Sequence, residues 1–369
     1  KNPKREHPEL VPALTELRGT DGYAIREADG DLYVYGAKEK GAMNGVYALI
    51  ENNTDYIFTR PSPQHGEVFT PRKDLAFVWG DGVVAKPKAT IRGLWNIRES
   101  AYWAANFATT CPAPWGDELK PYTRGGHNIN AFLGDFKEHN EFYGMVGGKR
   151  DKPYGNMVCF MNPKLKDFFA ENVLRLFDQV QGPEMRGVCI TLDDSYNWCG
   201  CPLCAKDFTL PTGELVKQTD PDFMSTQAFL LLNHAADRLN AAYFDKHIWS
   251  LAYFQTAEPP RCAVSPNLDM MFAPYYRAND TNPVFCEENL VWLDRLKRWR
   301  AKISNPETFF IRGYTGLGLA FPRPLCHTHQ RDWREYFKYC AGIDSEAVSV
   351  QPDGFKPGTT EPFSTMETM

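Results

Sequence analysis

The sequence has neither an excess of basic residues nor a long apolar run. It holds 41 Lys and Arg against 46 Asp and Glu, and the resulting net charge of −5 argues against nucleic acid, whose binding needs a basic footprint. No stretch approaches the roughly 18 apolar residues of a membrane span. The chain also begins without an initiator Met or a signal peptide. We therefore expect it to start inside a longer precursor that is exported to the periplasm or the extracellular space.

Cysteine is too sparse for a disulfide scaffold, with ten residues in a chain of 369. Most of the cysteines lie singly in apolar runs, where they are expected to be small buried hydrophobes. Examples are Cys159, Cys189 and Cys340. A Cys-x-Cys-x-x-Cys cluster is formed by Cys199, Cys201 and Cys204. Structural zinc takes four ligands, so a metal here would need a His or Asp from elsewhere, and a disulfide plus one free thiol is the alternative. We predict no other cofactor and no catalytic metal.

The most informative stretch is Gly187–Cys204. Val188–Leu192 are apolar or β-branched and predict a short buried strand, which leads directly into Asp193 and Asp194. In α/β barrels, acidic residues at the carboxyl end of a strand lie where the chemistry takes place. A simple Asp-Ser turn is the alternative. The second acid, and the aromatic residues that follow it, favour a functional site.

Residues 1–85 are expected to form a small α/β domain. Asp29-Gly30 between two short alternating segments, 24–27 and 32–35, indicates a β-hairpin. Residues 41–52 carry apolar side chains at helical spacing. The Gly- and Pro-punctuated stretch 79–90 is typical of a linker.

Residues 86–369 alternate strand-like and helix-like segments. Six to eight such steps predict a parallel sheet, most economically a (β/α)8 barrel. The chain ends where another helix begins, so we expect truncation near the last barrel helix. The expected strands cover residues 91–97, 125–133, 188–192, 248–254, 268–275, 308–314 and 347–350. The expected helices lie at 101–106, after Asn162-Pro163, and around Phe229–Tyr243, Trp292–Trp299 and Trp333–Cys340.

Several stretches resemble known glycosidase families. The first domain, through residues 41–50, resembles the small domain that precedes the barrel in family 20 hexosaminidases and α-glucuronidases. In the second region, residues 126–127, 136–150, 162–163 and the Asp194…Cys204 stretch are similar to a bacterial barrel family long described as a domain of unknown function. Part of that family is classed as glycoside hydrolase family 163. The resemblance spans nearly the whole chain and implies a retaining β-N-acetylglucosaminidase, with endo action on N-glycans as one form.

The same resemblance assigns roles to the acid pair. In the family 20 pattern the strand ends in Asp-Glu, where Asp orients the 2-acetamido group of the substrate and Glu protonates the leaving oxygen. Asp193 and Asp194 fall on these positions, although Asp194 is one methylene shorter than Glu. We predict that Asp194 is the general acid/base and that Asp193 orients the acetamido group, whose own oxygen is the nucleophile. Glu99 is the main rival for a catalytic carboxylate.

Polar and aromatic residues at the other strand ends are predicted to bind the substrate, an oligosaccharide or a glycoprotein glycan. One such group at each strand end suits the mouth of a sugar-binding site. These residues are Trp95, Arg98, Glu99, His127, Asn128, Trp198, Tyr253, Tyr275, Tyr276, Arg277 and Tyr314. His327 and His329 are expected to be a surface pair.

Three other functions stay open. An α-glucuronidase-like enzyme fits the same domain order and would use carboxylates roughly 6.5–9.5 Å apart. A non-catalytic glycan-binding barrel fits the Asp-Asp pair, which lacks the Glu of the family 20 pattern. A zinc-ribbon scaffold for partner proteins would require zinc at the cysteine cluster.

Overall fold

The computed structural model divides the chain into two compact units. The first contains Lys1–Asp117, Tyr314–Gln330 and Gly342–Met369, and the second contains Glu118–Gly313 and Arg331–Ala341. Among the described helices, none combines the length and the apolar character that crossing a membrane requires. The structure describes residues 7–58, 67–73, 76–80, 82–87, 91–95, 127–151, 157–180, 187–274, 284–315, 334–336, 338–340 and 342–347.

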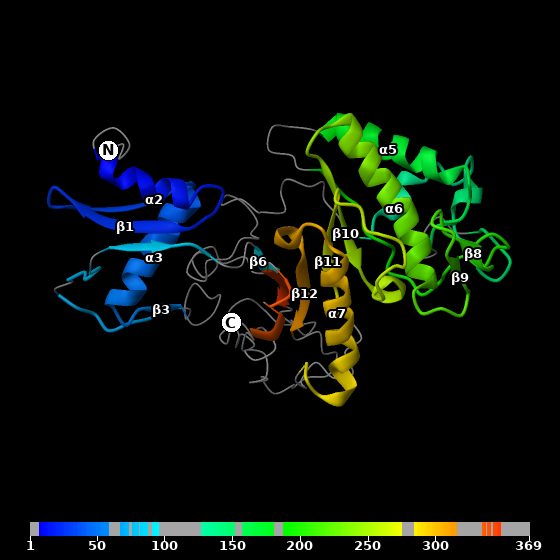
Figure 1. The fold of residues 1–369 in the computed structure, drawn as a ribbon. Coiled ribbons are helices and arrows are strands. Elements are labelled where there is room, and N and C mark those ends of the chain that lie inside the picture. Colours follow the sequence, from blue (N-terminus) through cyan, green and yellow to red (C-terminus); the bar gives the residue numbers. More distant parts are fainter. Residues whose placement is uncertain are drawn as a thin grey trace, which may run out of the picture. The chain divides into compact units, whose positions relative to one another are not determined.

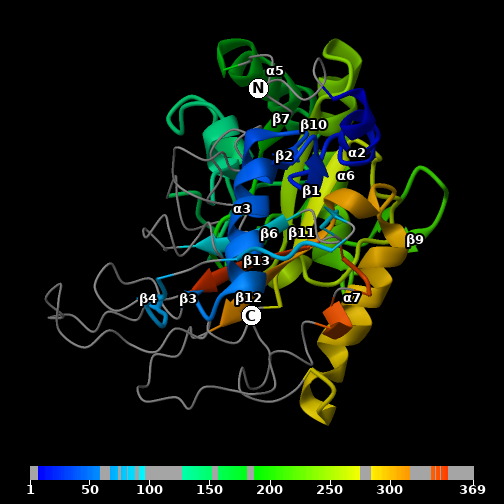
Figure 2. The ribbon, with the colours of Figure 1, turned by 90° about the vertical axis from the view of Figure 1, so that its left-hand side faces the viewer.

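The first unit holds a three-stranded antiparallel sheet in the order β2-β1-β5. The strands are β1 (Tyr23–Ala28), β2 (Asp31–Gly36) and β5 (Val83–Ala85). Helix α3 (Glu39–Asn53) packs against β1 and β2 (Figures 1 and 2). The shorter elements are η1 (Pro8–Leu10), α2 (Val11–Glu16), β3 (Ile57–Phe58) and β4 (Glu67–Val68), and β3 pairs with β4.

The hairpin between β1 and β2 forms where the sequence predicts it. Asp29 and Gly30 both have positive φ angles, 51° and 80°, as a two-residue type I′ turn requires. The turn sets the register, so that Ala24 lies opposite Tyr35. Both of these side chains are buried, together with Leu17 from the chain after α2. The small core of this unit therefore follows directly from the hairpin register.

The first unit also contains two strands that pair in parallel, β6 (Ile91–Trp95) and β13 (Gly342–Ala347). Ile91 lies opposite Gly342 although the two residues are far apart in the sequence. Asp344, Ser345 and Glu346 are poor strand formers, so the pairing of β13 with β6, and not local propensity, accounts for this strand.

Four parallel strands run through the second unit in the order β7-β10-β11-β12. They are β7 (Gly187–Cys189), β10 (His247–Ala252), β11 (Leu268–Phe272) and β12 (Phe310–Thr315). Every residue of β7 and β11 is buried, as expected for a parallel sheet that is covered on both faces. A small antiparallel pair, β8 (Phe208–Thr209) with β9 (Leu215–Val216), stands apart from this sheet.

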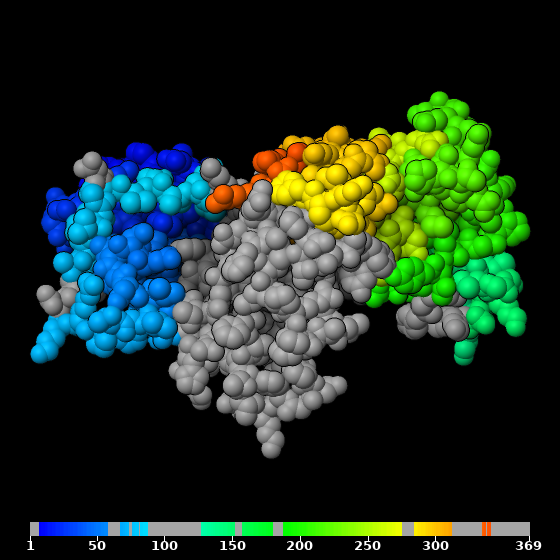
Figure 3. Space-filling view, turned by 90° about the horizontal axis from the view of Figure 1, so that it is seen from below, coloured from blue at the N-terminus to red at the C-terminus, as the bar shows by residue number. Residues whose placement is uncertain are grey.

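Three long helices lie in the described part of the second unit. They are α5 (Leu165–Val180), α6 (Phe223–Ala242) and α7 (Leu290–Lys302), and α5 lies alongside α6 (Figure 1). Trp299 of α7 packs against Phe229 of α6, with ring centroids 5.1 Å apart. Part of α7 lies at the molecular surface (Figure 3). Lys297 and Arg298 on this helix are exposed. The short helices are η2 (Ile129–Phe132), η3 (Asn140–Phe142), η4 (Phe254–Thr256), η5 (Glu287–Asn289) and η6 (Pro306–Thr308).

The structure confirms a mixed α/β fold with a parallel sheet, and closure into a (β/α)8 barrel stays a prediction. Three sequence expectations were wrong in part. The expected linker 79–90 contains β5, which pairs with β1. Within the expected strand 125–133, the described residues contain the short helix η2 (Ile129–Phe132), and His127 before it has a positive φ of 51° that is incompatible with an extended strand. The last strand, expected at 347–350, is β13 at Gly342–Ala347, and the expected helix 101–106 lies outside the described residues.

Candidate active site at the ends of β7 and β10

The acid pair lies at the carboxyl end of β7. Beyond Cys189 the chain stays buried through Leu192, and then emerges at Asp193, which is half-buried, and Asp194, which is exposed. Cys189 pairs in register with Trp249 of β10. Asp194 follows β7 and Tyr253 follows β10, and the Tyr253 hydroxyl lies 3.3 Å from Asp194 Oδ1. Parallel pairing thus brings two predicted site residues to one edge of the sheet.

Two N–H donors hold the Asp193 carboxylate in place. The side-chain amide of Asn130 donates to Oδ2 at 3.1 Å, and the backbone N–H of Asp194 donates to Oδ1 at 2.9 Å. Asn130 is only 6% exposed and lies on η2, whose start is fixed by a bond from Ile129 N–H to the Thr191 carbonyl. Asp193 is therefore a fixed group whose lone pairs are partly satisfied by the protein.

Asp194 has a different environment from its neighbour. Its side chain is exposed and accepts a hydrogen bond from the Tyr253 hydroxyl at 3.3 Å. Tyr253 itself is 6% exposed and follows β10 directly. The two adjacent carboxylates thus differ in burial and in the donors that they contact.

An aromatic stack begins beside Asp194. Phe254 stacks on Tyr253 at 3.9 Å between ring centroids, and Tyr196 stacks on Phe254 at 4.8 Å. Tyr196 is 66% exposed, so the outer end of the stack is open. Phe254 has a positive φ of 48°, a conformation uncommon outside glycine that is often found at functional sites. The stack offers a flat apolar surface next to a carboxylate.

His127 and Asn128 reach the same strand end from the start of the η2 segment. His127 Nδ1 bonds to the Leu192 carbonyl at 2.9 Å, and its ring lies 6.0 Å from that of Tyr253. A carbonyl only accepts, so Nδ1 carries the proton, and in the neutral ring Nε2 is the acceptor. Asn128 bonds to the backbone, donating to the Cys189 carbonyl and accepting from Thr191 N–H, each at 2.8 Å. Its amide thus continues the hydrogen bonding of β7.

Trp198 is half-buried and connects the acid strand to helix α6. Its indole N–H donates to Gln227 Oε1 at 3.1 Å, and its ring stacks on Phe160 at 4.8 Å. Gln227 in turn donates to the Cys204 carbonyl at 2.9 Å. These contacts hold Trp198 in place beside the acid loop.

The remaining predicted site residues are not brought to this strand end by any described contact. Trp95 lies on β6 and Tyr314 on β12. The others lie outside the described residues. They are Arg98, Glu99, Tyr275, Tyr276 and Arg277, together with the histidine pair His327 and His329.

The structure adds site residues that the sequence reasoning missed. Asn130 and Gln255 both contact the acid segment, Gln255 by donating to the Ser195 carbonyl at 3.0 Å. Asn130 Oδ1 and Gln255 Oε1 are buried and have no hydrogen-bond partner among the described residues. Buried acceptors are normally paired, so these two atoms are suited to a polar ligand or water. The only sequence signal for these two residues was their closeness to predicted site residues. Asn130 lies two residues after Asn128, and Gln255 lies two residues after Tyr253.

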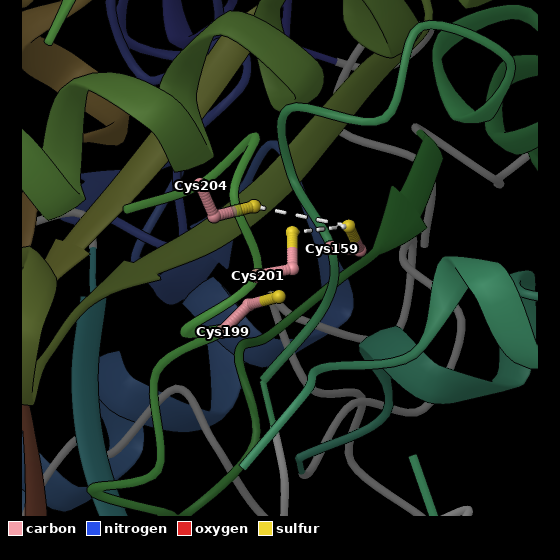
Figure 4. Close-up of side chains that lie close together, drawn as sticks. All are labelled: Cys159, Cys199, Cys201 and Cys204. Atoms are coloured by element: carbon pink, nitrogen blue, oxygen red, sulfur yellow. Dashed lines mark hydrogen bonds between the residues drawn. The ribbon is translucent and has the colours of Figure 1, made fainter. Parts of the chain in front are cut away.

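Four cysteines gather beyond Trp198 (Figure 4). Cys199, Cys201 and Cys204 are joined by Cys159, which was expected to be an isolated buried hydrophobe. Cys159 is indeed fully buried, but its sulfur faces the other three. Its hydrogen bond with Cys199 raises the pKa of Cys159, and the same contact lowers the pKa of Cys199. All four are free cysteines.

The described residues therefore define an α/β protein with a parallel sheet and an acidic pair at one strand end. The chain belongs to the family described as "Domain of unknown function (DUF4838)", whose profile matches residues 67–349. No curated protein gives a match to the sequence.

Among solved structures, the chain is similar to several glycoside hydrolases. CpGH84B is 10% identical with a TM-score of 0.39, over 92% of this chain and 56% of that one. A family 89 glycoside hydrolase from Clostridium perfringens, in complex with 2-acetamido-1,2-dideoxynojirmycin, is 14% identical with a TM-score of 0.37, over 89% and 43%. A beta-N-acetylhexosaminidase from Bacteroides fragilis NCTC 9343 is 13% identical with a TM-score of 0.38, over 93% and 70%. The chain thus spans about half the length of the first two.

Proposed function

We propose that the protein is a glycoside hydrolase that acts on an N-acetylhexosamine unit of a glycan. Asp194 serves as general acid/base and Asp193 orients the 2-acetamido group. The observation that supports this proposal is the asymmetry of the acid pair: Asp193 is half-buried and held by two N–H donors, whereas Asp194 is exposed and contacts one phenol. Two carboxylates in unlike environments are suited to two different catalytic roles.

Asp193 suits the orienting role because its position is fixed. A carboxylate has several lone pairs, so Asp193 can accept one more hydrogen bond, from the acetamido N–H of the sugar. That bond would turn the acetamido oxygen toward the anomeric carbon. In the first step this oxygen bonds to the anomeric carbon while the bond to the leaving oxygen breaks.

Asp194 suits proton transfer because its side chain is exposed and can reach the leaving group. It would donate its proton to the leaving oxygen in the first step. In the second step it would take a proton from water as that water attacks the anomeric carbon and the bond from this carbon to the acetamido oxygen breaks. The Tyr253 hydroxyl, at 3.3 Å from Asp194 Oδ1, would stabilise the ionised form between the two steps. The exposed ring of Tyr196 gives a sugar ring an apolar face to pack against.

The test is hydrolysis of an aryl N-acetyl-β-glucosaminide by the full chain and by two variants. Asp194→Asn keeps the shape and removes the titrating proton, so turnover should fall by about 10²–10⁴-fold, the usual contribution of a general acid. For a substrate whose leaving group has low basicity, the fall in turnover should be smaller, because that leaving group needs less protonation. Asp167→Asn changes an exposed carboxylate on α5 and is the matched control, expected to retain full activity.

Three results would change the assignment. Wild-type turnover in Asp194→Asn would remove Asp194 as the acid. Hydrolysis of an aryl glucuronide instead would favour the α-glucuronidase-like alternative. Glycan binding without turnover of any substrate would favour a non-catalytic barrel. We further propose that the sheet closes into a barrel and that a domain boundary lies near residue 85. We also propose that the protein is a member of glycoside hydrolase family 163 and is exported from the cell.

A further inference from the structure

We propose that Cys159, Cys199, Cys201 and Cys204 bind one zinc ion that has a structural role. The three later cysteines belong to the loop that follows the acid pair. The fourth, Cys159, comes from a separate segment and supplies the ligand that the Cys-x-Cys-x-x-Cys pattern lacks. This site goes beyond the proposed glycosidase and does not depend on it.

The spacing of the sulfurs fits a single tetrahedral ion. All four Sγ atoms lie within 4.8 Å of one another, and Cys159 Sγ is 3.5 Å from Cys201 Sγ and 3.8 Å from Cys204 Sγ. Four sulfurs at about 2.3 Å from one zinc ion would be separated by about 3.8 Å. A disulfide would bring two sulfurs to about 2.05 Å. In an iron–sulfur cluster the thiolates bind different irons and lie further apart, so one ion fits best.

The burial of the cluster indicates a closed, structural site. Each of the four cysteines is at most 2% exposed, and the partly buried side chains that pack on them are Met145 and Met161. Structural zinc sites use four protein ligands, whereas catalytic zinc keeps one position for water. The four cysteine side chains gather around one point (Figure 4) and are buried, so the ligand set is complete and points to a structural ion.

Donors around the sulfurs suit thiolates. The backbone N–H of Met145 donates to Cys199 Sγ at 3.3 Å, and Arg150 Nη2 donates to Cys159 Sγ at 3.4 Å. Zinc with four thiolates carries a net charge of −2, which the half-buried Arg150 guanidinium partly offsets. Such N–H contacts to the ligand atoms orient the ligands and tune the metal.

The ion would connect two segments next to the acid pair. Cys199 follows Asp194 by five residues, and Cys159 follows Val158, which forms a β-bridge with Tyr143. Between them lies the stack of Trp198 on Phe160. Zinc would thus hold the loop that follows the acids against residues 157–160.

The experiment measures the metal content of the full chain, purified without added chelator, by inductively coupled plasma mass spectrometry. We expect about one zinc per chain. Exchange for Co²⁺ should give the visible absorption bands of a tetrahedral cobalt thiolate, which report the ligand type directly. In Cys201→Ser the affinity for zinc, measured by competition with a chelator, should be at least about 10-fold lower than in the wild type. Cys262→Ser changes a cysteine outside the cluster and should keep it.

Wild-type measurements keep the proposal testable if the Cys201→Ser chain does not fold. Removal of zinc from the wild type should lower Tm, and added Zn²⁺ should restore it. Less than about a tenth of an equivalent of zinc, with four thiols that react freely, would overturn the proposal. A disulfide between any two of the four cysteines, found by peptide mass spectrometry, would also overturn it, as would iron in place of zinc.

Discussion

Asn130→Asp should destabilise the protein in a pH-dependent way. The substitution is isosteric and replaces the amide that donates to Asp193 Oδ2 at 3.1 Å by a second carboxylate. Asn130 is nearly fully buried, so water screens the new charge poorly. The two carboxylates must then either repel each other or share a proton.

The loss of unfolding free energy equals the smaller of two costs, the charge repulsion or the protonation of one carboxylate. Two unit charges about 3.1 Å apart repel by about 5 kcal/mol at an effective dielectric constant of 20. Protonating one Asp costs about 4 kcal/mol at pH 7, because an ordinary Asp ionises near pH 4. The shared proton then bridges the pair and replaces the lost hydrogen bond. We therefore expect the variant to lose up to about 4 kcal/mol of unfolding free energy at pH 7.

The pH dependence has a definite sign. The folded variant binds one proton more than the unfolded chain, so its stability relative to the wild type falls as pH rises. The difference should be close to zero near pH 4 and should grow by about 1.4 kcal/mol per pH unit up to pH 7. Denaturant unfolding at several pH values measures it. Asn140→Asp, at an exposed position, is the charge-matched control and should show no such slope. A destabilisation that does not change with pH would refute the contact between residue 130 and Asp193.

Two further substitutions test contacts elsewhere in the second unit. Burial raises the pKa of Glu258, but hydrogen bonds from Arg298 and Arg295 outweigh this effect and hold it below its ordinary value. The stabilisation of the fold by the ionised Glu258 is therefore present above about pH 4.5 and lost as pH falls through the folded pKa. Glu258→Gln should remove about 1–2 kcal/mol of unfolding free energy at neutral pH, measured by denaturant unfolding. Gly187→Ala should cost about 3 kcal/mol or more, because the new Cβ would lie 1.7 Å from the His247 carbonyl oxygen, and an unchanged Tm would contradict the close pairing of β7 and β10.

Elements with a strong local signal were predicted well. The Asp29-Gly30 hairpin, the helix that became α3, and the buried stripe of α6 appear as expected, because turn chemistry and periodicity are properties of neighbouring residues. Strand β13 was misplaced by several residues, and a strand was predicted where η2 forms. The first depends on its pairing with β6, and the second on a positive φ at His127, which no composition pattern announces.

The candidate site was predicted in part for the same reason. Asp193, Asp194 and Tyr253 were identified because each follows a strand with a clear apolar signal. Asn130 was missed, since its amide reaches Asp193 only when η2 packs beside the end of β7. Their catalytic roles stay predictions until the variants are measured.

The sequence by itself determined the alternation of strands and helices, the acidic strand end and three clustered cysteines, because these are local patterns of polarity and spacing. Only the tertiary structure decided which residues meet. It brought Tyr253 to Asp194 through parallel pairing of β7 and β10, and it brought Cys159 to within 3.5 Å of Cys201 from 42 residues away. Contacts between distant segments depend on register and packing, which no short stretch of the chain contains.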